Sequence, residues 1–357
     1  MMMNPTWKHE ERSGYALRSL YRSYGYIPYK MSRFEEYDLY VRNKDFLVSD
    51  QIITFSDRSG RLLALKPDVT LSIVKNAPEE PGAVQKVYYQ ENVYRDYREI
   101  LQAGLECVGD LGEYEIAEVV LLAAKSLQLL GGRWMLDISH MGLLAAVLED
   151  SGLGLEQQNR AMEYLHRKNY HQLKALCAGN AAWAKLSAIA SCRGGRESLQ
   201  QLEDLLTTTA ERQALEQLKG LWKILEASGF ADSIRLDFSV ANNMRYYSGV
   251  VFRGYLEGIP ASVLSGGQYD KLPQKMGRNA KAIGFAIYLG LLENRNRDED
   301  DFQVDTLIFH DGTADPMDLT AAAEEAAQKG TVLVTRELPK NRNWKQLLRF
   351  EKGVWGK

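Results

Sequence analysis

The apolar residues of this chain fall into two blocks of short runs, separated by one long helical stretch. In the first block, runs at 52–55 and 62–65 flank Asp57-Arg58-Ser59-Gly60, a sequence typical of a hairpin turn. The stretch from 141 to 229 has helical periodicity and contains no proline. Strands that pair as hairpins, with helices elsewhere, predict an antiparallel sheet flanked by helices in an α+β fold, and not a doubly wound sheet. The sequence has no GxxxxGKS/T loop and no GxGxxG after a strand.

Helices are expected outside the central stretch as well. The spacing of apolar residues predicts them over 9–25, 113–130 and 282–293. A further helix should follow Pro67, which ends the run at 62–65. Asp68 or Thr70 can cap that helix, because a short oxygen-bearing side chain accepts the free amides of a first helical turn.

The C-terminal residues are expected to form a separate small unit. Residues 294–301, NRNRDEDD, are a charged linker, and a βαβ-like pattern follows them over 304–335. The tail over 336–357 is basic, and we expect it to be solvated or to dock on a partner. The predicted domains are therefore 1–298, with a helical insertion at about 141–229, and 299–357, a truncated α/β unit with its tail.

Composition excludes several classes of function. The net charge of −3 and the pI near 6.1 argue against a large nucleic-acid surface, because phosphate binding needs a basic face. The three cysteines form no CxxC and the five histidines no HExxH, so no metal site or cofactor is predicted. No apolar run reaches the ~18 residues of a membrane span, and the N-terminus has no signal-like apolar segment. We expect a cytoplasmic protein that does not contact a membrane.

The segment QAGLECVG, 102–109, has the alternation of a strand. Gln102, Gly104 and Glu106 share one face, because successive side chains of a strand point to opposite sides. On that face the strand holds an amide and a carboxylate, and Gly104 between them leaves room for a ligand. Such a pair could hold the ammonium and imidazole groups of an amino acid such as histidine. The pattern fits solvated outer-face residues equally well.

Five segments resemble, in order, the motifs of the histidyl-tRNA synthetase catalytic domain: LALKPDVTLSI (62–72), VYRDYREILQAGLECVG (93–109), NNMRYYSGVVFRGY (242–255), SGGQYDKL (265–272) and IGFAIYLGLL (283–292). The resemblance covers about residues 10–293. It implies the class II aminoacyl-tRNA synthetase fold, an antiparallel sheet flanked by helices, and a dimer formed through this core.

The same resemblance implies a histidine-binding site. The positions that match histidine contacts in the family are Asp68, Thr70, Gln102, Glu106, Tyr246 and Tyr247, with Tyr269 a weaker candidate. Arg95 matches the motif 2 arginine. Without ATP, we expect Arg95 to pair with Glu99, Asp96 or a carboxylate of the ligand.

The chain departs from the family where the synthetase handles ATP. Only six residues separate Arg95 from Gln102, where the family has a long loop. Asn242 stands at the arginine that stabilises adenylation, with Arg245 at the aspartate of that motif, and Gly290-Leu291 replaces the Glu-Arg pair of motif 3. Two further differences are Gln268 at an arginine position and Tyr288 at a glycine that would admit adenine. Losing one positioned donor in such a site costs on the order of 10²–10³ in rate. We therefore predict no catalytic residues and no aminoacylation.

A synthetase-like chain with a shortened motif 2 and a curtailed C-terminal unit resembles the ATP phosphoribosyltransferase regulatory subunit family. The resemblance implies a non-catalytic protein that forms a hetero-oligomer with the short-form catalytic subunit and activates the first step of histidine biosynthesis. It also implies feedback by histidine and no binding of tRNA. Two other hypotheses stay open: a divergent enzyme that adenylates an amino acid or another acceptor, and a stand-alone paralogue that senses histidine or binds RNA.

Overall fold

The computed structural model describes residues 9–47, 51–78, 80, 82–180, 182–240, 246–292, 304–339, 343–351 and 354–356. The chain divides into two compact units, Met1–Glu293 and Asn294–Lys357. The charged segment predicted as a linker, 294–301, lies outside the described residues.

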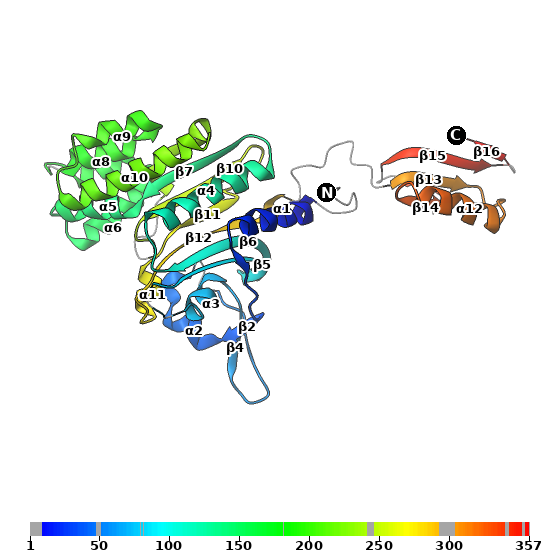
Figure 1. Ribbon diagram of the computed structural model, residues 1–357, viewed down its shortest axis with the longest axis horizontal. Coiled ribbons are helices and arrows are strands. Elements are labelled where there is room, and N and C mark those ends of the chain that lie inside the picture. The colour runs from blue at the N-terminus through cyan, green and yellow to red at the C-terminus, as the bar shows by residue number, and fades with distance from the viewer. Residues whose placement is uncertain are drawn as a thin grey trace. The chain divides into compact units, whose positions relative to one another are not determined.

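A nine-stranded sheet forms the centre of the first unit (Figure 1). Its strand order is β1-β5-β6-β12-β11-β10-β7-β9-β8. The pairs β1–β5 and β7–β9 are parallel and the other neighbours are antiparallel, which confirms the predicted α+β fold. The strands are β1 (Ile27–Pro28), β5 (Val84–Arg95), β6 (Arg98–Gly109), β7 (Trp134–His140), β8 (Arg193–Gly194), β9 (Ile234–Asp237), β10 (Val250–Leu256), β11 (Leu264–Gln268) and β12 (Lys281–Tyr288).

Two long helices pack on one face of this sheet. They are α1 (His9–Ser23) and α4 (Glu113–Leu130), at the positions that the sequence predicted. The Glu115 side chain accepts a hydrogen bond from the Gly112 amide at 2.9 Å, which satisfies one free donor at the start of α4. Leu17 and Tyr21 of α1, together with the apolar side of α4, pack against Leu105 and Phe285 of the sheet. The sheet face that these two helices cover therefore holds the main apolar core.

A second apolar cluster covers the opposite face at the β5–β6 end of the sheet. It contains Leu71 and Ile73 together with Val87, Val93 and Val108 of the sheet. The elements here are α2 (Tyr37–Arg42), η1 (Lys44–Phe46), α3 (Thr70–Lys75), α11 (Lys271–Lys275) and the small sheet of β2 (Phe34–Glu36), β4 (Leu62–Leu65) and β3 (Thr54–Ser56). The predicted hairpin corresponds to β3 and β4, which pair antiparallel.

The stretch predicted to be helical forms a group of helices at one end of the sheet, drawn in green in Figure 1. They are α5 (Met141–Asp150), α6 (Leu155–His166), α7 (Tyr170–Leu176), α8 (Ala182–Ser191), α9 (Arg196–Glu203) and α10 (Thr209–Ala227). The Thr208 hydroxyl accepts from the Glu211 amide at the start of α10. The short turns η2 (Ala231–Ser233) and η3 (Phe238–Val240) flank β9.

The helix predicted over 282–293 is wrong. Residues 281–288 form β12, which lies between β6 and β11, and only Leu289–Leu292 form a short 3₁₀ turn, η4. Ile283, Phe285 and Ile287 enter the main core, and the alternate residues of β12 lie on the opposite face of the sheet. A strand buried on both faces has a nearly continuous apolar sequence, and this sequence resembles that of a buried helix.

The second unit contains the predicted βαβ arrangement, formed by β13 (Val304–His310), α12 (Pro316–Ala327) and β14 (Val332–Thr335). The tail over 336–357 contains two strands, although the sequence predicted a solvated or docking segment there. It supplies β15 (Trp344–Glu351), parallel to β13, and β16 (Val354–Gly356), so the sheet order is β14-β13-β15-β16. Ring contacts between Phe350 and Trp355 hold the last two strands together. In the described part of the chain, no helix is long and apolar enough to cross a membrane.

Candidate functional site

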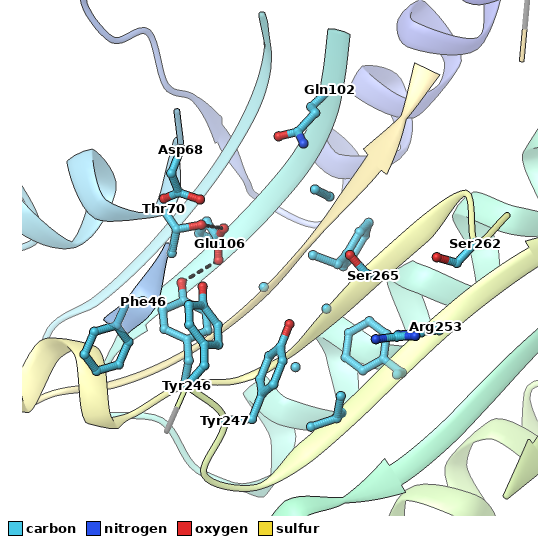
Figure 2. A pocket seen from close by; sticks show the side chains of 18 of the residues that line it. Phe46, Asp68, Thr70, Gln102, Glu106, Tyr246, Tyr247, Arg253, Ser262 and Ser265 are labelled. Atoms are coloured by element: carbon cyan, nitrogen blue, oxygen red, sulfur yellow. Dashed lines mark hydrogen bonds between the residues drawn. The ribbon is translucent and has the colours of Figure 1, made fainter. Parts of the chain in front are cut away.

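A cavity of about 490 Å³ lies in the first unit, on the sheet face that α3 covers (Figure 2). Its volume is within the range of small-molecule sites, roughly 300–1,000 Å³. The residues predicted for a ligand site all line it: Asp68, Thr70, Arg95, Gln102, Glu106, Tyr246, Tyr247 and Tyr269. Segments that lie up to 201 positions apart in the sequence thus meet at one place, because the sheet order puts β12 between β6 and β11.

The β5–β6 hairpin positions three of these side chains. The two strands pair without interruption from Val84↔Gly109 to Arg95↔Arg98. They are joined by Asp96 and Tyr97 alone, with φ of 51° and 59°. Two central residues with positive φ are the geometry of the type I′ turn, whose twist matches that of paired strands. The segment between Arg95 and Gln102 is therefore strand and turn, with no loop that could fold over a nucleotide.

Glu106 lies at the bottom of the cavity and is only 2% exposed. Thr70 Oγ1 donates to its Oε1 at 2.9 Å, and the Tyr269 hydroxyl donates to its Oε2 at 2.5 Å. Burial raises the pKa of this carboxyl to about 8, although the two hydrogen bonds oppose the shift. A cationic group of a ligand would therefore meet a carboxyl that can ionise near neutral pH.

Glycines make the space that the Glu106 side chain occupies. Gly284 faces Glu106 across the β6–β12 ladder, and a Cβ at Gly284 would lie 1.6 Å from Glu106 Oε2. Gly104 does not leave an open space for a ligand, as the sequence suggested. The Tyr89 hydroxyl fills that space, 2.6 Å from where a Cβ of Gly104 would lie.

Asp68 and Arg95 satisfy each other at the edge of the cavity. Arg95 Nε donates to the Pro67 carbonyl at 2.6 Å, and its guanidinium lies 3.6 Å from Asp68 Oδ2. Burial raises the pKa of the Asp68 carboxyl, and the positive charge of Arg95 opposes that shift. Asp68 Oδ1 also accepts from the Leu71 amide, which confirms it as a cap of the α3 first turn. The described contacts of Arg95 are thus on the Pro67–Asp68 segment instead of at Glu99, which accepts from Asn92 and Tyr94.

Aromatic rings form one wall of the cavity next to Glu106. The centroid of Tyr246 lies 4.7 Å from that of Tyr247 and 5.6 Å from that of Tyr269. Phe46 of η1 closes the group, 5.7 Å from Tyr246. Ring faces beside a carboxylate suit a flat cationic or hydrogen-bonding group, because the quadrupole of an aromatic ring attracts positive charge.

Gln102 carries a buried donor without a partner. Its side chain is 2% exposed and lines the cavity, and its Nε2 makes no hydrogen bond with the residues that the structure describes. Leaving such a group unsatisfied costs about 1–3 kcal/mol. A ligand acceptor would recover that cost, so Gln102 favours binding of a polar molecule. The described residues contain no cluster of His, Cys, Asp and Glu side chains that could hold a metal ion.

Comparison with known proteins gives the family. The model of the histidyl-tRNA synthetase family matches residues 2–292. The ATP phosphoribosyltransferase regulatory subunit of Clostridium kluyveri is 30% identical over 76% of this chain and 74% of that protein. The chain belongs to the ATP phosphoribosyltransferase regulatory subunit family.

Solved structures show the same fold. An ATP phosphoribosyltransferase regulatory subunit/histidyl-tRNA synthetase from Bacillus halodurans superposes with a TM-score of 0.79 at 24% identity, over 98% of this chain and 96% of that one. A chain of the ATP phosphoribosyl transferase (HisG:HisZ) complex from Thermotoga maritima has a TM-score of 0.62 at 19% identity, over 78% and 97% of the two chains.

In this regulatory-subunit chain, other side chains stand at positions where the resemblance to a synthetase places ATP-handling residues. Of these, Tyr288 lines the cavity, and its hydroxyl lies 3.1 Å from Ser265 Oγ. Gln268 donates to Asp270 at 2.7 Å. Gly290 and Leu291, at the positions of the Glu-Arg pair, lie in η4 and supply no charge. Asn242 and Arg245 lie outside the described residues.

The sequence reasoning missed other residues of the site. Tyr89 and Arg95 share one face of β5, so strand alternation could have assigned Tyr89 to the cavity. Arg253 follows the tyrosine motif on β10, and its parity with Val251 places it on the same face. Phe46 had no such signal, because it reaches the cavity through the packing of η1.

Proposed function

We propose that this chain is a non-catalytic regulatory subunit. It binds a short-form ATP phosphoribosyltransferase catalytic subunit, activates the first step of histidine biosynthesis, and responds to histidine held in the cavity around Glu106. Membership of the regulatory-subunit family supports the partner. The fold recurs in the Thermotoga maritima complex, whose name includes two components, HisG and HisZ.

One observation carries the proposal. The described side chains around Glu106 are arranged as an amino-acid ligand would require, whereas those on the other side of the cavity are not arranged to hold ATP. Glu106 is held by Thr70 and Tyr269 among aromatic rings. The loop that would cover ATP is replaced by the turn at Asp96-Tyr97, and Tyr288 stands over the nucleotide side. A chain that binds the amino acid without activating it can regulate by binding alone.

Regulation by histidine requires that histidine bind differently to two states of the assembly. A ligand shifts an equilibrium only by its difference in affinity for the two states. We propose that histidine in the cavity shifts the complex between an active and an inhibited arrangement. We also propose that the chain dimerises through its sheet core and does not bind tRNA.

Co-purification tests the partner. The chain and the short catalytic subunit are expressed together, separated by size exclusion with light scattering, and assayed for phosphoribosyl transfer. The expected result is a complex that is more active than the catalytic subunit alone. A chain that binds histidine but forms no complex and gives no activation would instead be a stand-alone sensor.

Calorimetric titration with histidine tests the site. Glu106→Gln keeps the size of the side chain and removes the carboxyl group that can ionise against a cationic ligand, so we expect a loss of affinity of about tenfold or more. Glu149→Ala, at the exposed end of α5, is the matched control and should bind as the wild type does. Equal affinity of wild type and Glu106→Gln would reject the proposed histidine site at Glu106. It would not affect the proposed role of the partner subunit.

ATP–pyrophosphate exchange with histidine tests the loss of synthetase activity. No exchange is expected from protein that binds histidine in the same buffer, because binding shows that the site is folded. Exchange above the background of a Glu106→Gln control would favour the divergent adenylating enzyme.

A further inference from the structure

The floor of the cavity is a grid of side chains from four neighbouring strands. Across the ladders, Glu106 of β6 faces Gly284 of β12, which faces Gly267 of β11. Gly267 in turn faces Val251 of β10, so these residues form one row on the same face of the sheet. The next row contains Gly104, Ala286, Ser265 and Arg253. Three of its four members are small, and because the Tyr89 hydroxyl covers Gly104, Ala286 and Ser265 are the small residues that leave the floor low between Glu106 and Arg253.

Arg253 has no ion-pair partner of its own among the residues that the structure describes. It lines the cavity and is partly buried, and among the described residues it makes no ion pair or hydrogen bond. Asp137 faces Arg253 across the β7–β10 ladder but forms an ion pair with Arg235. The Nε and Nη2 of Arg235 donate to the two carboxylate oxygens of Asp137 at 2.7 and 2.8 Å. Burial raises the pKa of the Tyr247 phenol, and the positive charge of Arg253 opposes that shift. The guanidinium is therefore close enough to interact electrostatically with a side chain of the cavity wall.

The charges of the cavity are separated along its length. Figure 2 shows Arg253 beside Ser262 and Ser265, on the side away from Thr70 and Glu106. Three strand spacings and one two-residue step separate the Cα atoms of Glu106 and Arg253, roughly 16 Å in a flat sheet. The two side chains extend over much of that distance, and the remaining gap is of the order of the length of one amino acid.

We propose that Arg253 binds the carboxylate of the effector amino acid and makes the cavity selective for a zwitterion. The proposal rests on the proposed function and adds a specificity-determining residue to it. Arginine presents two parallel N–H donors that match a carboxylate, and Ser262 and Ser265 lie within the same corner. The cationic and imidazole groups of the ligand then face Glu106 and the aromatic wall.

The charge balance favours a carboxylate over a phosphate. Arg95 is engaged by Asp68, so Arg253 is the cation left to a ligand among the described residues of the cavity. A nucleotide would bring several negative charges into a cavity that already contains Glu106 and Asp68. A neutral zwitterion complements one carboxylate and one guanidinium.

Calorimetric titration with L-histidine and with histidinol tests this assignment, because histidinol differs only in having an alcohol for the carboxylate. The wild type should prefer histidine by roughly 10- to 100-fold, the range for a charge-assisted hydrogen bond. In Arg253→Met that preference should fall to near one, with the affinity for histidinol unchanged. Unchanged histidinol binding also shows that the variant is folded. Arg253→Lys should keep part of the preference, and Arg133→Met, an exposed arginine next to β7, should keep all of it.

Three outcomes overturn the proposal. If Arg253→Met keeps the preference of the wild type, Arg253 is not the carboxylate ligand, although the effector site remains. If ATP competes with histidinol and loses affinity in Arg253→Met, Arg253 binds a phosphate instead. If neither histidine nor histidinol binds the wild type, the effector role of the proposed function fails as well.

Discussion

The carboxylate of Glu106 occupies the volume that a side chain at Gly284 would need. A Cβ at this glycine would lie 1.6 Å from Glu106 Oε2 and 2.5 Å from the Leu105 carbonyl. Gly284→Ala should therefore displace the carboxylate and break its hydrogen bonds with Thr70 and Tyr269. We expect a loss of about 2–4 kcal/mol in the free energy of unfolding, measured in urea, and loss of histidine binding.

Gly290→Ala is the control for that substitution. Gly290 follows β12 in η4, and a Cβ there would meet no atom of the described part of the chain within 4 Å. Its unfolding free energy and histidine affinity should match the wild type. Wild-type behaviour of Gly284→Ala would contradict the placement of Glu106.

The pKa of Glu106 predicts how stability depends on pH. Burial raises the pKa from 4.5 to about 8. Because the folded protein holds this proton more tightly than the unfolded chain, stability is fully present below pH 4.5 and falls as the pH rises toward 8. At about 1.4 kcal/mol per unit, the contribution is of the order of a few kcal/mol. Glu106→Gln should lose less stability between pH 5 and 8.5 in urea unfolding, and parallel pH profiles of the two proteins would reject the shift.

The turn at Asp96-Tyr97 predicts a stabilising change. Tyr97 has φ of 59° and its side chain is 82% exposed, so it pays backbone strain for little contact. Tyr97→Gly creates Asp-Gly, a favoured type I′ pair, and should raise the unfolding free energy by up to about 1 kcal/mol. Tyr97→Ala keeps the strain and should give no gain. A lower urea midpoint for Tyr97→Gly would argue against this turn geometry.

Lys66 and Glu91 form a buried ion pair. Replacing one or the other residue should reduce the stability of the protein by different amounts. Lys66 is 1% exposed, whereas the Glu91 side chain is 19% exposed. Glu91→Gln leaves an ammonium group in the interior and should destabilise by about 3–5 kcal/mol. Lys66→Met leaves a carboxylate that water can reach, so the loss should be smaller. Thermal unfolding of both variants gives the order, and the reverse order would contradict the difference in burial.

Much of the architecture could be read from local patterns. The hairpin of β5 and β6, the helix over 113–130 and the helices over 141–227 follow from periodicity and glycine stops, because these signals act over a few residues. The strand over 281–288 could not be predicted in this way. Ile283 and Ala286 are both apolar because each face of β12 is covered, and only the neighbouring strands tell whether such a run is a helix or a strand. The same holds for β15, whose partner β13 lies about 40 residues earlier.

For the site, local sequence patterns indicate which side chains are available and which face of β6 they share. Gln102 and Glu106 point to one side because strand alternation is a property of the backbone. The hydrogen bonds that Thr70 and Tyr269 donate to Glu106, the Tyr89 hydroxyl in the space above Gly104, and the lack of an ion-pair partner for Arg253 among the described residues became apparent only from the folded structure. These relations depend on burial and on contacts between distant strands. Periodicity contains no information on either.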